Sequence, residues 1–346
     1  MSISQLLHRL GVAAAAAASI GAFSSSAAAQ EVNLYTTREP GLIRPLLDAF
    51  TKASGVKVNA VFVKEGIAER VTAEGKLSPA DVMMTVDFGN LVDLADKGLT
   101  QSVQSKVLET AVPANLRDPA GHWFTMSTRA RVIYVSKDRV KQTAFTYEEL
   151  ADPKWKGKVC LRAGQHPYNT AMFAAFMAKH GPAKTEEWLK GIKANAGRKP
   201  GGGDRDVARD IMGGICDIGV ANSYYVGLMR SGKGGPDQLK WGSAINVVLP
   251  TFADGKGTHV NISGAAVAKT APNRDNAVKL LEYLVSDAAQ KLYAEVDYEY
   301  PVKAGAQIDP LIAQIGTLKV DPTPIVEIAK NRKAASELVD KVGFDN

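Results

Sequence analysis

The 346-residue chain contains only two cysteines and five histidines, and their spacing excludes the common metal and nucleophile motifs. Two lone cysteines do not make a zinc site, and no histidines have the H-E-x-x-H spacing of zinc proteases. The chain also lacks the G-x-S-x-G turn of serine hydrolases and the G-x-G-x-x-G turn of dinucleotide-binding domains. Since no nucleophile can be matched with a base, the sequence does not indicate an enzyme.

Charge of one sign is not concentrated at any point of the chain. The formal net charge is +6, from 42 Lys and Arg against 36 Asp and Glu. Nucleic-acid-binding proteins carry blocks of Lys and Arg, and this chain has none. We therefore expect no nucleic-acid partner and interpret the small excess as an aid to solubility.

The apolar run at residues 10–23 is too short to cross a bilayer, which takes roughly 20 residues. It follows Arg9 and leads into a Ser/Ala-rich stretch that ends Ala27-Ala28-Ala29-Gln30. This pattern predicts a secretory signal peptide over residues 1–29, cleaved after Ala29. No cysteine lies at the cleavage site, so we expect an exported protein without a lipid anchor.

The two cysteines, Cys160 and Cys216, both fall in predicted strands. In an oxidising compartment an even number of cysteines permits a disulfide. Two separate buried thiols, acting as small apolar side chains, are the alternative. The residues alone leave both readings open.

What the chain does contain is an alternation of strand and helix patterns. Strands are predicted at residues 32–35, 56–63 and 81–85, with helices between them and a third helix capped by Asp87. Segments 123–126 and 131–135 read as strands that cross between two lobes. A second alternating set follows, with strands at 158–162, 215–221, 245–249 and 263–268 and helices at 168–179, 184–195, 204–212, 273–286, 288–294 and 322–342.

This alternation predicts an α/β fold of two lobes around a cleft, each a mixed, mostly parallel sheet flanked by helices. We expect an N-lobe of residues 30–127 plus about 262–300, a C-lobe of 128–261, and a C-terminal helical segment of 301–346. Ligands bind at the carboxyl ends of the strands in such sheets.

The strand at 215–221 leads directly into Ser223, Tyr224 and Tyr225. Ser223 is the expected N-cap of a helix, which places both tyrosines in its first turn, where their directions differ by about 100°. Two phenols could then reach one point, and the positive helix terminus favours phenolates that a hard cation would bind. The alternative is that both tyrosines only pack or line a rim.

Several segments, spread in order over nearly the whole predicted mature chain, match one family. They include Asn33-Leu34-Tyr35-Thr36-Thr37-Arg38-Glu39, Ser78-Pro79-Ala80-Asp81-Val82, Arg129-Ala130-Arg131-Val132-Ile133-Tyr134, residues 147–158, Asn222-Ser223-Tyr224-Tyr225, residues 257–264 and Tyr298-Glu299-Tyr300-Pro301. Together they resemble the periplasmic ferric-ion-binding proteins of ABC importers, also called bacterial transferrins.

The resemblance implies Fe(III) ligands at Tyr168, Tyr224 and Tyr225. Some members add a histidine and a tyrosine just after the first strand, where this chain has Glu39 and Pro40. Proline cannot bind a metal, so Glu39 and Tyr35 are the candidates for a further ligand or a hydrogen-bond partner of one. Relatives without those ligands use a synergistic anion such as carbonate, for which Arg38, Arg129 and Arg131 are the candidate binders.

The resemblance further implies a monomer in the periplasm that delivers iron to an inner-membrane ABC permease and its ATPase. Two alternatives stay open on the residues. One is a binder of an organic solute such as thiamine, a polyamine or a phosphonate on the same fold. The other is a secreted enzyme, for which no acid/base pair was found.

Overall fold

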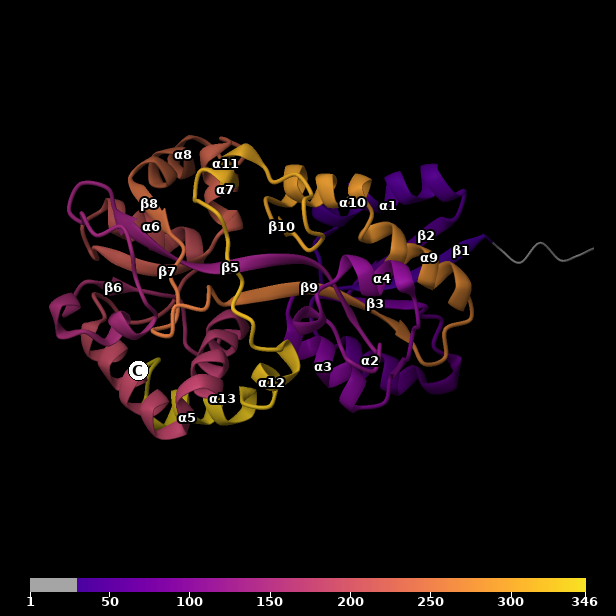
Figure 1. Cartoon of the computed structure of the whole chain (residues 1–346), viewed down its shortest axis with the longest axis horizontal. Helices are drawn as coiled ribbons and strands as arrows, with labels where there is room; N and C mark the ends of the chain where they lie inside the picture. Colours follow the sequence, from indigo (N-terminus) through magenta and orange to yellow (C-terminus); the bar gives the residue numbers. More distant parts are fainter. Residues whose placement is uncertain (1–29) are drawn as a thin grey trace, which may run out of the picture. The chain divides into compact units, whose positions relative to one another are not determined.

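The computed structural model describes residues 30–346, so the predicted signal peptide lies outside the described residues. Ten strands are assigned in this part of the chain (Figure 1). They are β1 (Glu31–Thr36), β2 (Lys57–Phe62), β3 (Val82–Thr85), β4 (Thr100–Gln101), β5 (Phe124–Ser136), β6 (Val159–Cys160), β7 (Ile218–Asn222), β8 (Ile245–Val248), β9 (Val260–Ala268) and β10 (Tyr300–Pro301).

Helices pack around these strands. They are α1 (Pro40–Ser54), α2 (Ile67–Glu74), α3 (Phe88–Asp96), α4 (Lys106–Ala111), α5 (Pro167–Asn195), α6 (Asp204–Met212), α7 (Tyr224–Arg230), α8 (Pro236–Ser243), α9 (Arg274–Leu284), α10 (Asp287–Leu292), α11 (Pro310–Ala313), α12 (Ile325–Ala329) and α13 (Arg332–Lys341). A π-helical turn, η5 (Tyr293–Asp297), follows α10. The mixed α/β character predicted from the alternation is confirmed.

The long strand β5 joins two groups of strands, and it runs across the middle of Figure 1. Up to Ala130 it pairs with β9, and from Arg131 onward it pairs with β7 and β8. The hydrogen-bonded order is β2-β1-β3-β9-β5-β7-β6. All 13 residues of β5 are buried, as expected for a strand covered on both faces.

The prediction of mostly parallel sheets is wrong. Parallel pairing links β1 to β2 and β3, and β6 to β7. Every pair that β5 and β9 make is antiparallel. These two strands run in the direction opposite to the strands beside them. The two short strands expected at 123–126 and 131–135 are therefore one continuous strand. The predicted lobe boundaries stay a prediction.

Two helix predictions met different outcomes. Asp87 caps α3 as predicted, because its side chain accepts from the backbone N–H groups of Gly89 and Asn90. Ser223 precedes α7 but makes no capping bond. Its hydroxyl instead accepts from the N–H of Ala130 at 3.2 Å, which ties the start of α7 to β5.

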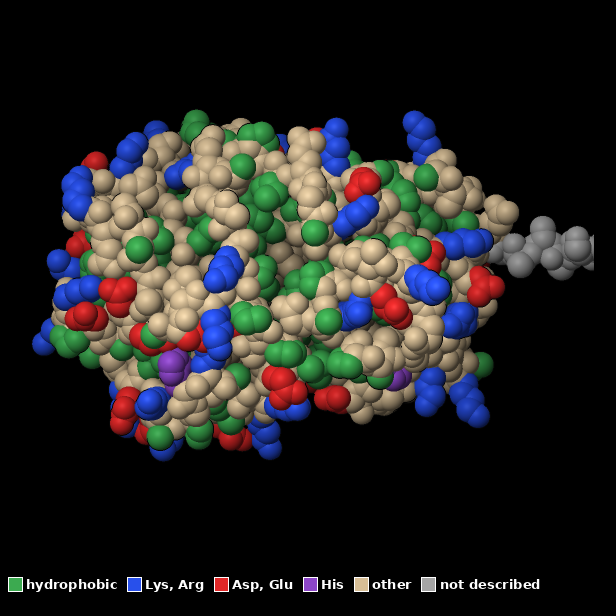
Figure 2. Space-filling model, viewed as in Figure 1, with side chains coloured by type: hydrophobic (Ala, Val, Ile, Leu, Met, Phe, Trp, Pro, Cys, Tyr) green, Lys and Arg blue, Asp and Glu red, His purple; other side chains and the backbone are tan. Residues whose placement is uncertain are grey.

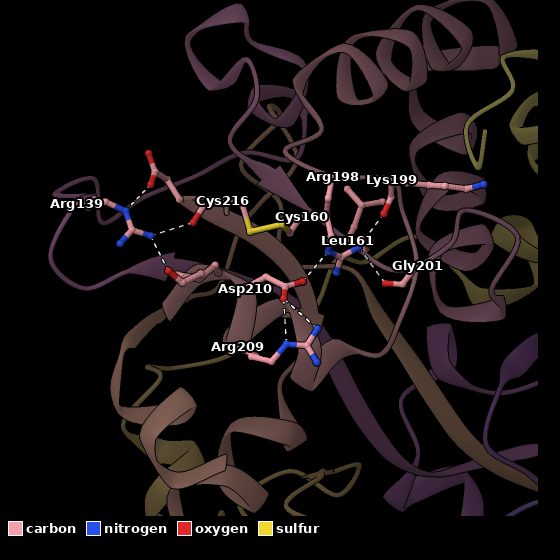
Figure 3. The surroundings of a disulfide bond; sticks show 11 residues. Arg139, Cys160, Leu161, Arg198, Lys199, Gly201, Arg209, Asp210 and Cys216 are labelled. Carbon is pink, nitrogen blue, oxygen red and sulfur yellow. Dashed lines mark hydrogen bonds and ion pairs between the residues drawn. A yellow bond between two sulfur atoms is a disulfide. The ribbon is translucent and has the colours of Figure 1, made fainter. Parts of the chain in front are cut away.

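The two cysteines form a disulfide, which settles the alternative that the sequence left open. Cys160 ends β6 and Cys216 lies just before β7, so the bond joins β6 to the segment that leads into the neighbouring parallel strand (Figure 3). The two cysteines are 56 positions apart in the sequence, so the bond closes a loop of that size. In the chain-entropy account a loop of this size stabilises the fold by about 4 kcal/mol.

The visible surface carries both signs of charge in mixture (Figure 2). Lys and Arg side chains are interspersed with Asp and Glu across this face, without a basic patch of the kind that binds nucleic acid. Within residues 30–346, no helix combines the length and apolarity that a membrane crossing requires.

Candidate functional site

Two neighbouring parallel strands lead to the three candidate tyrosines. β6 and β7 pair with Cys160 opposite Gly219, so their carboxyl ends face the same edge of the sheet. Tyr168 is the second residue of α5, the helix after β6, and Tyr224 and Tyr225 begin α7, the helix after β7. Side chains from both helix starts therefore converge where ligands bind in α/β proteins.

The three phenols share one neighbourhood. The ring centres of Tyr224 and Tyr225 lie 4.1 Å apart. The guanidinium carbon of Arg129, on β5, lies 5.7 Å from the ring centre of Tyr168 and 5.9 Å from that of Tyr224. Arg129 thus connects the tyrosine of α5 with the pair on α7. The structure brings together the three tyrosines that the resemblance implied as ligands.

The environment keeps two of these phenols protonated in the absence of a cation. Burial is the main cause of the raised pKa of Tyr224, and the nearby phenols of Tyr168 and Tyr225 raise it further. Burial, Asp204 and Tyr168 raise the pKa of Tyr225. Crowded phenols resist ionisation because their phenolates repel one another, and a bound multivalent cation would remove that repulsion.

Two arginines that sequence reasoning missed also surround the site. Arg162 lies with its guanidinium carbon 5.1 Å from the ring centre of Tyr168, and Arg205 lies 5.7 Å from that of Tyr225. Burial and, after it, the charge of Arg162 lower the pKa of the neighbouring imidazole of His166 to about 4. His166 is therefore neutral near pH 7, and its Nδ1 accepts from the N–H of Tyr168 at 3.2 Å.

The three arginines expected to bind an anion differ in how many of their donors are used. Arg38 is buried between Asp297, at 2.5 Å, and Glu299, at 2.9 Å. It therefore serves a carboxylate cluster after α10. Arg131 is bonded through both terminal nitrogens, to Asp204, Asn222 and Asn169.

Arg129 retains the most capacity for another ligand. Its Nη2 donates to Ser263 Oγ at 2.6 Å and to the carbonyl of Ile262 at 2.9 Å. Its Nη1 lies 3.9 Å from Glu299, too far for a hydrogen bond, and its Nε has no partner among the described residues. Arg129 is the one of the three that also borders the tyrosine rings.

The residues considered as further ligands lie elsewhere. The hydroxyl of Tyr35 donates to Glu74 Oε1 at 2.9 Å, and its ring lies under the guanidinium of Arg70. Glu39 is exposed at the start of α1, where Pro40 is the first helical residue. Each has a local role that does not involve the three tyrosines.

A cavity of about 440 Å³ borders Tyr168. His166 and Pro167 line it beside Tyr168, and the other lining residues come from the chain at the ends of β1 and β3, from residues 64–69 around the start of α2, and from α3 and its end. A larger cavity of about 760 Å³ lies beside β10 and residues 301–322 and is lined by none of the three tyrosines. We assign the smaller cavity to the site because Tyr168 lines it; Tyr224 and Tyr225 are not among its lining residues.

The position of α7 depends on a close contact at Gly227, one turn after Tyr224. A Cβ at this position would lie 2.4 Å from Cγ of Tyr298, so only glycine permits the approach. Tyr298 itself adopts a left-handed backbone with φ 58°. The contact ties the tyrosine-bearing helix to the segment that carries Glu299.

No group of three or more His, Cys, Asp or Glu side chains in residues 30–346 is arranged to hold a metal ion. The donors gathered at this site are phenols. Hard trivalent cations prefer anionic oxygen, and tyrosinate is an established ligand of ferric iron in proteins.

Comparison with known proteins gives consistent matches. Residues 35–291 match the family described as bacterial extracellular solute-binding protein. Iron uptake protein A1 of Synechocystis sp. is 40% identical over 91% of this chain and 88% of its own. A solved Bordetella ferric binding protein is 66% identical, with a TM-score of 0.87 over 91% of this chain and all of its own. A Trichodesmium protein solved with iron and citrate is 41% identical, with a TM-score of 0.86 over 91% and 99%.

Proposed function

The chain belongs to the family of bacterial extracellular solute-binding proteins, and on that premise we propose that it captures ferric iron in the periplasm. The match confirms the resemblance found in the sequence and the two-lobed type II periplasmic binding protein fold. It also makes the chain a binding protein and not an enzyme.

The observation that carries the proposal is the meeting of Tyr168, Tyr224 and Tyr225 around Arg129. As phenolates, the three side chains would neutralise the three charges of Fe(III). They would leave about three positions of a six-coordinate ion for other oxygen donors. The relatives named for iron uptake and ferric binding support this choice of cargo.

A small synergistic anion, such as carbonate, would fill two of those positions. Arg129 is its proposed binder, because its Nη1 and Nε have unused donor capacity beside the tyrosines. A planar guanidinium matches carbonate or a carboxylate in a paired, charge-assisted arrangement. We leave Tyr35 and Glu39 out of the proposed ligand set because of their separate contacts.

In this proposal the protein acts as a monomer and delivers iron to an inner-membrane ABC permease and its ATPase. The test of the cargo is a titration of iron-free protein with ferric nitrilotriacetate. We expect a visible band from phenolate-to-iron charge transfer that saturates at one iron per chain. A protein that stays colourless and instead binds thiamine, a polyamine or a phosphonate would overturn the proposal.

A further inference from the structure

We infer that Arg131 is a positioning residue that holds the three tyrosines at the spacing a single ion requires, an inference that rests on the proposed function. Arg131 is 1% exposed and lies on β5 at the point where the strand changes partners from β9 to β7. Its Nη1 donates to Asp204 Oδ2 at 2.6 Å and to Asn222 Oδ1 at 3.2 Å. Its Nη2 donates to Asn169 Oδ1.

Each partner of Arg131 lies beside one of the tyrosine-bearing segments. Asn169 directly follows Tyr168 in the first turn of α5. Asn222 ends β7, two residues before Tyr224. β7, α5, α6 and α7 gather in the same half of Figure 1, and β5 runs into that half from the middle.

The third partner, Asp204, is the first residue of α6 and precedes Arg205, whose guanidinium lies near the ring of Tyr225. Asp204 Oδ2 also accepts from the backbone N–H of Asn222 at 2.7 Å. Through its ion pair with Asp204 and its hydrogen bonds to the two asparagines, Arg131 therefore joins the starts of α5 and α6 to the end of β7. These segments are otherwise separate in the sequence.

This geometry uses the planar fork of arginine, which presents several donors in fixed directions. A lysine at 131 would keep the charge but, as a point charge on a flexible stem, could not hold all three partners in place. With both terminal nitrogens committed, Arg131 has only its Nε left for an anion, whereas Arg129 has both its Nη1 and its Nε. This positioning role differs from the anion-binding role that the resemblance implied. The two roles predict different effects of bicarbonate on the iron affinity of an Arg131 variant.

The experiment compares Arg131→Lys with a matched control, Arg198→Lys. Arg198 is a less buried arginine that also forms an ion pair, with Asp210 at 2.6 Å near the disulfide (Figure 3). Iron affinity is measured against competing citrate at several bicarbonate concentrations, together with the position and intensity of the visible band. Thermal unfolding of the iron-free proteins separates affinity from stability.

We expect R131K to lose about tenfold or more in iron affinity, in line with other residues that orient metal ligands. The loss should be the same at every bicarbonate concentration, and the visible band should shift or weaken because the phenolates no longer share one geometry. R198K should keep the wild-type band. If R131K retains wild-type affinity and band, or loses only its bicarbonate dependence, the positioning role is wrong.

A second variant decides the matter if R131K does not fold. The side chain of Asn222 makes one hydrogen bond, from Arg131, and its Nδ2 has no partner among the described residues. Asn222→Ala therefore removes one arm of the network and little else, and it should weaken the band and the affinity in the same manner. A wild-type band in Asn222→Ala would overturn the inference. Absence of the band from the wild-type protein would instead reject the proposed function.

Discussion

The rings of Tyr224 and Tyr225 lie with their centres 4.1 Å apart and their planes inclined by 35°, although the residues are adjacent in the chain. The first turn of α7 produces this arrangement, since neighbouring positions there diverge by about 100° and not by the 180° of a strand. Two phenols can thus serve one point from a single helix start. Tyr168 reaches the same neighbourhood from α5, with Arg129 between them.

Removing one phenol oxygen should weaken iron binding without unfolding the protein. We expect Tyr168→Phe, Tyr224→Phe and Tyr225→Phe each to lose at least about 100-fold in affinity and part of the visible band, because phenylalanine keeps the ring but not the ligand. Tyr283→Phe, on α9 and packed against Phe50, is the matched control. Wild-type affinity in Tyr224→Phe and Tyr225→Phe would remove this pair from the site.

Iron binding should release protons and weaken in acid. The pKa of Tyr224 and that of Tyr225 are raised, so both phenols hold their protons until a cation displaces them. Each proton released makes the apparent affinity fall by about tenfold per pH unit of acidification. A calorimetric titration in buffers of different ionisation enthalpy counts these protons. Zero net release near pH 7 would contradict phenolate ligation.

Iron affinity should depend on a small anion through Arg129. Adding bicarbonate or a small dicarboxylate to anion-free buffer should raise the affinity, because the anion supplies donors that the protein lacks. In Arg129→Gln the rise should be blunted, since the guanidinium that holds the anion is gone. A flat response to anions, combined with loss of binding in Glu39→Ala, would show that a protein carboxylate fills those positions instead.

The disulfide should contribute to stability and not to the iron ligands. The double variant Cys160→Ala with Cys216→Ala should unfold about 4 kcal/mol more easily, because the loop between them is no longer closed in the unfolded chain. Urea unfolding of the iron-free protein measures this loss. The visible band of the iron-loaded variant should match the wild type, and a displaced band would mean that the bond also sets the spacing of β6 and β7.

His259 should make the iron-free protein sensitive to acid. Burial is the main cause of its low pKa, about 3, against the usual 6.5 of an unfolded chain. The unfolded state therefore binds the extra proton between pH 6.5 and about 3, and stability falls as the pH is lowered through that window.

In His259→Gln the free energy of unfolding should therefore fall less steeply as the pH is lowered, by up to about 1.4 kcal/mol per pH unit. Urea unfolding at pH 7, 5.5 and 4 measures the slope, with the half-buried His122→Gln as control. An unchanged slope in His259→Gln would assign the acid sensitivity to other groups. If the visible iron band fades at a higher pH than the pH at which the protein unfolds, iron release is distinct from unfolding of the protein.

Local sequence patterns predicted those features of the fold, such as helices, strands and helix caps, that are set by residues close together in the chain. The hydrophobic periodicity located most of the helices and strands but missed short helices such as α4 and α8, and Asp87 was identified as a cap because its partners lie two and three residues ahead. Tyr224 and Tyr225 could be placed in a helix start for the same reason. Tyr168 was found through the family resemblance, since nothing near it in the sequence marks it as a ligand.

Contacts between distant residues could not be read in this way. Arg38 meets Asp297 and Glu299 across some 260 positions, and nothing around Arg38 indicates that its charge is already paired. Arg131 likewise reaches Asp204 and Asn222 only after β5 and β7 pair. Arg162 and Arg205 were missed because the signal that identifies them, a guanidinium over a tyrosine ring, exists only in the folded chain.

A crystal structure of the iron-loaded protein would show which side chains bind the ion. Anomalous diffraction at the iron edge would locate the ion independently of the fitted side chains. We expect one iron bonded to the phenol oxygens of Tyr168, Tyr224 and Tyr225, with a small anion between the iron and Arg129. An iron bound by carboxylates or imidazoles away from these tyrosines would contradict it.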